Sequence, residues 1–81
     1  RIEEAVTALR HAAGAFRELG DRWFQARCLR TIAEILVGAN RPAEAREPAE
    51  EAVRIYQSLG NEVGEARAEH ILARTRPPEK R

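Results

Sequence analysis

Six polar residues recur at matched positions forty residues apart and could bind an anionic partner. They are Arg27, Arg30 and Glu34 and, at the same positions of a second copy, Arg67, His70 and Arg74. Five of the six can be cationic, and guanidinium groups form strong charge-assisted hydrogen bonds with carboxylates. The alternative is a solvated face on which Arg30 and Arg74 pair with nearby glutamates, because surface ion pairs often contribute little.

Catalytic and metal-binding chemistry is not indicated by the remaining residues. Cys28 is the only cysteine and lies in an apolar stretch, so we expect a buried side chain rather than a nucleophile. His11 and His70 are isolated, and no pair of residues has zinc spacing. Neither a glycine-rich phosphate loop nor a nucleophile elbow is present. We therefore expect no enzyme activity, no cofactor and no metal.

Length and charge narrow the classes of partner. The 81 residues suffice for one small domain, and the formal net charge is +1. Arginines and glutamates alternate along the chain, so we expect no nucleic-acid partner, which would need a clustered cationic excess. No run approaches the ~18 apolar residues of a membrane span. The single cysteine fits a reducing compartment, and we expect a cytoplasmic protein.

A repeat of forty residues predicts the elements that carry the polar positions. The residues that return unchanged are small, apolar or turn-forming, together with one arginine. The matched pairs are Ala5 and Ala45, Ala12 and Ala52, Leu19 and Leu59, Gly20 and Gly60, Ala26 and Ala66, Arg27 and Arg67, and Ala33 and Ala73. Such a period is typical of stacked units that share a core, so we expect an all-α solenoid.

The spacing of apolar residues predicts a four-helix arrangement. The helices are expected over about residues 2–19, 22–38, 43–59 and 62–75. Gly20 is expected to end the first helix in the left-handed conformation, and Asp21 to cap the second. Gly60 and Asn61 repeat this corner. The corners predict antiparallel helical hairpins.

Prolines modify this arrangement at two places. Pro48 removes a backbone donor, which predicts either a kink in the third helix or a helix that begins near Glu47. Pro77 and the proline after it end the fold. We therefore expect a helical domain over residues 1–75 and a disordered tail over residues 76–81.

Branched and small apolar residues at fixed spacing carry a family resemblance. They are Leu29, Ile32, Ala33, Leu36, Ala45, Ala49 and Ala52. This pattern resembles the tetratricopeptide repeat, in which two antiparallel helices meet through small residues. The twelve residues from Ala33 to Ala45 and the seven from Ala45 to Ala52 match the spacing of that family. The resemblance implies a fragment of an α-solenoid made of helical hairpins.

Residues 16–29 and 56–69 resemble a longer, 40-residue variant of this repeat. That variant is similar to the helical arrays of large bacterial signal-transduction NTPases and transcriptional activators. The resemblance implies a protein-interaction module. The first helix of each repeat would line a concave groove, where the six polar residues would hold a protein partner or an acidic peptide.

Self-association is the alternative function. The first predicted helix carries an additional apolar row at Ile2, Val6 and Leu9. We expect this row to be exposed in the isolated chain and to be covered either by the rest of an array or by a second copy. Trp23 and Phe24 are adjacent and cannot share one helical face. We expect Trp23 in the core. Phe24 is then either a contact residue or a cover for the edge of the first helix.

The last predicted helix has polar residues where the second helix has apolar ones. Glu69 stands forty residues after Leu29, and Arg76 forty residues after Leu36. Polar residues at core positions are typical of a capping helix. We therefore expect the C-terminal end of a longer array, and, because the sequence begins with Arg1 rather than Met, a fragment of a larger protein.

Overall fold

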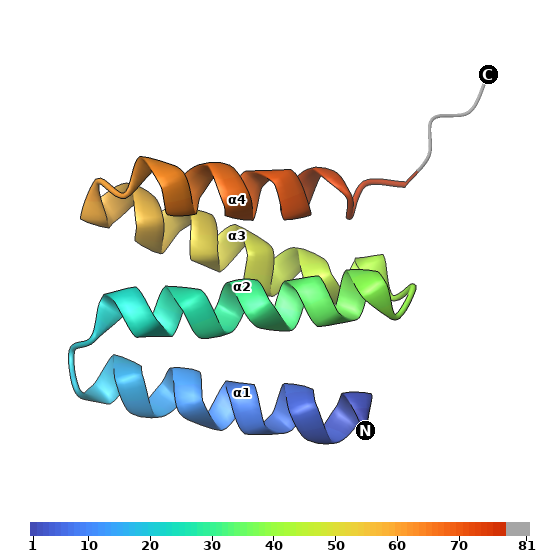
Figure 1. Ribbon diagram of the computed structural model, residues 1–81, viewed down its shortest axis with the longest axis horizontal. Helices are drawn as coiled ribbons and strands as arrows, with labels where there is room; N and C mark the ends of the chain where they lie inside the picture. Colours follow the sequence, from blue (N-terminus) through green and yellow to red (C-terminus); the bar gives the residue numbers. More distant parts are fainter. Residues whose placement is uncertain (78–81) are drawn as a thin grey trace.

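Four antiparallel helices follow one another in the described part of the chain. The computed structural model describes residues 1–77. Its helices are α1 (Ile2–Glu18), α2 (Arg22–Gly38), α3 (Pro42–Leu59) and α4 (Glu62–Ala73). Each helix packs on the next, and α2 also contacts α4. In the view of Figure 1, α3 lies behind α2 and α4, and α1 lies along the other side of α2.

This arrangement confirms the predicted all-α fold of helical hairpins, and residues 1–77 contain no strand. The fourth helix ends at Ala73, two residues before the expected end, and a turn follows it. Most of the predicted disordered tail, residues 78–81, lies outside the described residues.

The two corners at one end of the molecule have the same backbone. Gly20 and Gly60 have φ angles of 78° and 68°, a conformation that costs glycine little. Asp21 accepts a hydrogen bond from the amide three residues later at 3.2 Å, and Asn61 does the same at 2.9 Å. Each therefore satisfies a free donor at the start of α2 or α4. Both corners lie at the left of Figure 1.

The turn at the opposite end is held by ion pairs. Asn40 adopts a φ of 62°, and no side chain caps the start of α3. Arg41 instead binds Glu44 on α3 and Glu3 on α1, each at 2.6 Å. The hydrogen bond from Arg41 lowers the pKa of the Glu44 carboxyl. Arg41 thus links the start of α3 to the start of α1.

The core is built around small side chains where the helices cross. Ala33, Ala45 and Ala52 are completely buried, as the repeat pattern predicts. Alanine at these positions lets helix axes approach to about 8–10 Å. The branched side chains of Ile32 and Leu36 fill the remaining space and are also inaccessible to solvent.

Pro48 does not delay the start of α3. The helix runs without interruption over Pro42–Leu59, so the expectation that it begins near Glu47 is wrong. Pro48 lies in the second turn and is fully buried. Its ring therefore contributes apolar contacts that offset the missing backbone donor.

Three large apolar side chains at repeated positions are exposed. Leu19 and Leu59 are 78% and 43% exposed, because Leu19 directly follows α1 and Leu59 is the last residue of α3, each at a corner. Trp23 is 44% exposed, so its expected place in the core is wrong. Its counterpart in the second copy, Val63, is 67% exposed as well. The matched pair is thus a surface pair.

Candidate functional site

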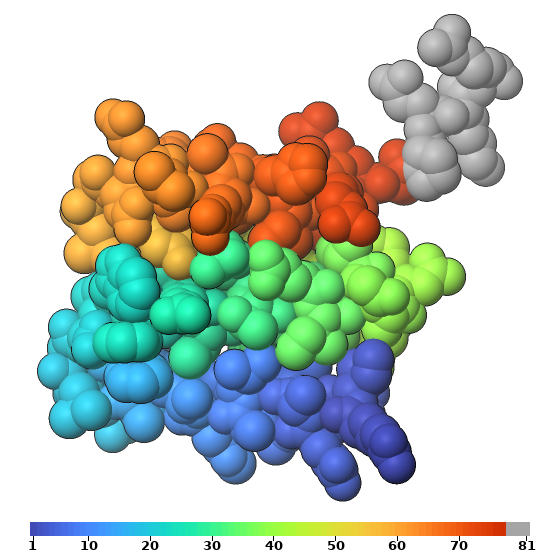
Figure 2. All heavy atoms as spheres, in the orientation of Figure 1, coloured from blue at the N-terminus to red at the C-terminus, as the bar shows by residue number. Residues whose placement is uncertain are grey.

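Two matching rows of residues run along α2 and α4. The row on α2 is Trp23, Arg27, Arg30 and Glu34. The row on α4 is Val63, Arg67 and His70, continued by Arg74 directly after the last helical residue. Spacings of four, three and four residues place each row on one face of its helix. Because α2 contacts α4, the two rows form one surface, here called the α2/α4 surface. Figure 2 shows α2 and α4 adjacent on the same side of the molecule.

The polar residues predicted for this surface divide into two groups. Arg30 is largely buried and binds Glu34 at 3.2 Å, so this pair neutralises itself within α2. The Nε atom of Arg30 is buried without a hydrogen-bond partner among the described residues. Arg30 and Glu34 therefore contribute to the structure of α2 more than to the charge of its surface.

The other four predicted residues are exposed cationic or titratable groups. They are Arg27, Arg67, His70 and Arg74. None of them forms an ion pair with another residue of the range 1–77. The predicted local pairing of Arg74 with a glutamate is thus not seen in that range. The α2/α4 surface presents an excess of positive charge.

Trp23 belongs to the α2/α4 surface and was missed by the sequence reasoning. The guanidinium carbon of Arg27 lies 5.7 Å from the centroid of the Trp23 ring. Trp23 also meets Phe24 edge to face at 4.8 Å, and Phe24 stacks on Phe16 of α1 at 5.0 Å. The rings of Phe16, Phe24 and Trp23 thus form one aromatic cluster that extends from α1 to the α2/α4 surface. The available signal was that Trp23 lies one helical turn before Arg27.

The residues predicted for self-association are less exposed than expected. Val6 is buried, and Ile2 and Leu9 pack against the core. The expected exposed row on α1 is therefore wrong, because this face of α1 packs inside the chain. Phe24 alone of the four predicted residues is exposed, at 40%. Phe24 also covers the end of α1 by stacking on Phe16, as one of its two interpretations expects. Its role as a contact residue stays a prediction.

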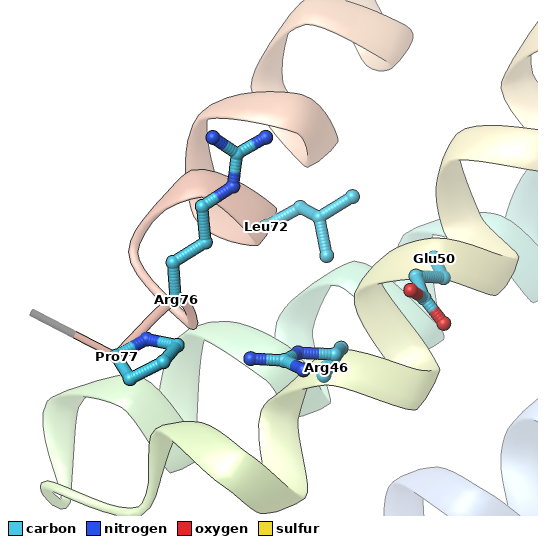
Figure 3. Close-up of a pocket in the computed structure, with 5 residues that line it drawn as sticks. All are labelled: Arg46, Glu50, Leu72, Arg76 and Pro77. Atoms are coloured by element: carbon cyan, nitrogen blue, oxygen red, sulfur yellow. The ribbon is translucent and has the colours of Figure 1, made fainter. Parts of the chain in front are cut away.

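A hollow of about 360 Å³ lies between α3 and the end of α4 (Figure 3). Its lining residues are Arg46, Glu50, Leu72, Arg76 and Pro77. Arg46 donates hydrogen bonds to the carbonyl oxygen of Thr75 at 2.9 Å and to its hydroxyl oxygen at 3.4 Å. Arg46 thus ties the end of α4 to α3.

Two further hollows within residues 1–77 lie outside the α2/α4 surface. One, of about 150 Å³, is lined by Arg10, Ala13, Gly14, Arg17, Gln25, Leu29 and Glu51. The other, of about 410 Å³, lies on α1 and is lined by Glu3, Glu4, Thr7, Ala8 and His11. The α2/α4 surface is an open face, which suits an extended segment better than a small molecule.

The remaining candidates for chemistry offer no built site. Burial raises the pKa of the Cys28 thiol, and the charge of Arg27 opposes that shift. A thiol with a raised pKa is a poor nucleophile. Within residues 1–77, no three histidine, cysteine, aspartate or glutamate side chains are grouped so as to hold a metal ion. None of the helices described has the length and apolar character needed to span a bilayer.

Comparison with known proteins supports the architecture. A family model described as Tetratricopeptide repeat matches residues 1–58, which include α1, α2 and most of α3. No curated protein and no solved structure gives a significant match. The matched residues are well over half of the chain, and the helical hairpins they form are those the family requires. The chain belongs to the tetratricopeptide repeat family.

Proposed function

We propose that this chain binds an acidic segment of a protein partner across the α2/α4 surface. Tetratricopeptide repeats are protein–protein interaction modules. The observation that carries the proposal is the set of exposed groups without an ion pair in residues 1–77: Arg27, Arg67, His70 and Arg74. Guanidinium groups recognise carboxylates through paired hydrogen bonds.

Several contacts are needed at once for such binding. One exposed ion pair contributes only about 0–1 kcal/mol, so a single carboxylate would bind weakly. Three arginines and a histidine on two neighbouring helices can engage several carboxylates of one extended segment. Binding of this kind weakens as salt screens the charges.

We further propose that α4 closes the array. Four positions of α2 are buried, with exposures of 0, 6, 0 and 2%: Ala26, Leu29, Ala33 and Leu36. Their counterparts forty residues later, three in α4 and one just after it, are all exposed: Ala66, Glu69, Ala73 and Arg76. A further hairpin packed here would bury Glu69 and Arg76, and burying unpaired charges is costly. This face therefore suits contact with water.

The 40-residue spacing and the single buried thiol are consistent with a cytoplasmic regulatory protein of a bacterium as the parent of this module.

Self-association is the second candidate function, and the exposure of Phe24 favours it. Sedimentation velocity across a hundredfold range of concentration tests it. A dimer that dissociates in Phe24→Ala would support self-association, and a concentration-independent monomer would exclude it.

A paired charge reversal tests the proposed binding surface. Peptides are first selected on the wild-type chain from a random library displayed on phage. Their affinities are then measured for Arg27→Glu/Arg67→Glu and for the control Arg10→Glu/Arg54→Glu, which makes the same change in net charge on α1 and α3. We expect the first variant to weaken binding at least about tenfold and the control to change it less than about twofold. Equal effects of the two variants, or a selection that yields no binder, would contradict the proposal.

A further inference from the structure

We propose that the partner segment carries a large apolar side chain beside its carboxylates, and that this side chain packs against Trp23 and Val63. This inference rests on the proposed function and specifies the class of ligand. Both rows of the α2/α4 surface begin with an apolar residue and continue with an arginine one turn later: Trp23 before Arg27, and Val63 before Arg67. The order of chemistry along the surface is therefore the same in both repeats.

The apolar end of the surface has exposed area to offer. Trp23 and Val63 are 44% and 67% exposed, and Phe24 extends the apolar area towards α1. Burying a large apolar side chain contributes free energy that exposed ion pairs do not supply. Tryptophan in particular is enriched among the residues that dominate binding at protein interfaces.

The Trp23 ring is also held in position. Its edge-to-face contact with Phe24 and the nearby guanidinium of Arg27 both restrict its rotation. An aromatic side chain that is already ordered loses little conformational entropy when a partner binds. A carboxylate on Arg27 would lie next to the apolar side chain packed on Trp23, so both contacts can form together.

Helical geometry fixes the spacing of the ligand groups. Trp23 and Arg27 are separated by about 6 Å along α2, and Arg67 and Arg74 by about 10 Å along α4. An extended peptide advances about 3.3 Å per residue. We therefore expect carboxylates about two to five residues from the apolar side chain.

Charge decides between a foreign segment and a second copy of this chain. Two α2/α4 surfaces placed face to face would oppose arginine to arginine, which is unfavourable in an interface. An acidic segment instead neutralises Arg27, Arg67 and Arg74 while its apolar side chain covers Trp23. The surface is complementary to such a segment and not to itself.

The composition of the selected peptides provides the first test. We expect enrichment of Phe, Leu, Ile or Trp at one position, with Asp or Glu two to five residues away. Because Trp23 is the only tryptophan, its emission reports occupancy of the apolar end directly. We expect peptides without tryptophan to shift this emission to shorter wavelength. Replacing the apolar residue of the peptide by alanine should weaken binding about tenfold or more.

Protein variants provide the matched comparison. Trp23→Ala should weaken binding about tenfold, whereas Leu19→Ala should change it less than about twofold. Leu19 is a more exposed apolar residue at the same end, but it lies in the corner and outside the surface. Circular dichroism checks that both variants fold. The peptide series measured on the wild-type chain does not depend on that condition.

The possible outcomes separate this inference from the proposed function. Acidic peptides that depend on Arg27 and Arg67 but show no apolar enrichment and no loss in Trp23→Ala would overturn the inference alone. Apolar peptides that are insensitive to Arg27→Glu/Arg67→Glu would overturn the proposed function. A surface that pairs with a second copy, with Trp23 emission dependent on protein concentration, would overturn the acidic segment as its occupant.

Discussion

The two corners at one end of the molecule share a backbone and differ in their side chains. At the second corner, Tyr56 is 3% exposed and its ring lies against Gly64, where any Cβ atom would overlap the ring. At the first corner, Phe24 replaces this glycine and stacks on Phe16 at 5.0 Å, and both rings remain partly exposed. The residue at this one position of the repeat, Gly64 or Phe24, thus accompanies a buried ring at the second corner and a partly exposed ring at the first.

Under the proposed function, this difference lets one repeat contribute to stability and the other to recognition. The second corner buries its aromatic ring and gains the full benefit of removing that area from water. The first corner leaves aromatic area exposed beside Trp23 and Arg27, on the surface that we propose binds the partner. Substitutions at matched positions of the two corners measure the two contributions separately.

The largest expected difference in stability is between the aromatic residues at matched positions of the two repeats, Tyr56 and Phe16. Tyr56→Ala should destabilise the chain by about 3–4 kcal/mol, because it removes a fully buried ring. Phe16→Ala should cost about half as much, since Phe16 is only partly buried. Urea denaturation followed by circular dichroism measures both values. Equal losses would show that the first corner is as well packed as the second.

Alanine substitutions of two glycines should have smaller effects on stability, and the two effects should differ in sign. Gly64→Ala places a methyl group against the ring of Tyr56 and should cost about 1–3 kcal/mol. Gly14→Ala, at an exposed position in the C-terminal half of α1 where the added methyl group would meet no neighbour within 4 Å, should stabilise the chain by about 0.5–1 kcal/mol. The midpoints of chemical unfolding give both signs.

A double-mutant cycle checks the cause of the Gly64 effect. If overlap with the ring is responsible, Gly64→Ala should cost much less when Tyr56 is already alanine. An undiminished cost in that background would assign the effect to the helix itself.

The smallest expected difference is between the capping residues. Asn61→Ala should destabilise the chain by about 1 kcal/mol, because its hydrogen bond of 2.9 Å is partly buried. Asp21→Ala should cost less, about 0.5 kcal/mol, since its bond of 3.2 Å is exposed to water. Thermal unfolding of the two variants side by side resolves the order, and the reverse order would mean that the first corner depends more on its cap.

The sequence was sufficient for the helices and for the contacts made by small residues. Repetition identifies Gly20 and Gly60 as corners, and the twelve-residue step from Ala33 to Ala45 places both alanines in the core, where they are fully buried. These features depend on local geometry and on spacing. Local geometry and residue spacing can both be read from a single sequence, without knowing which helices pack against each other.

The orientation of individual faces was harder to predict. Val6 was expected outside and is buried, while Trp23 was expected inside and is exposed. Hydrophobicity alone does not distinguish these two residues. Among the helices, α1 packs only on α2, so the position of α2 decides which apolar row of α1 is buried. Trp23 lies in the first turn of α2, beside a corner. The sequence offered local pairing of Arg30 and Arg74 with glutamates as an alternative, and the structure shows it for Arg30 with Glu34 but not for Arg74 within residues 1–77.

The most direct test of the central claim is a map of the binding surface by NMR. The ¹⁵N-labelled chain is titrated with a selected acidic peptide that contains one apolar anchor. We predict the largest shift changes at the Trp23 indole and at Arg27, Arg67, His70 and Arg74, with α1 and α3 largely unchanged. Changes concentrated on α1 and α3, with the α2/α4 surface unaffected, would contradict the account.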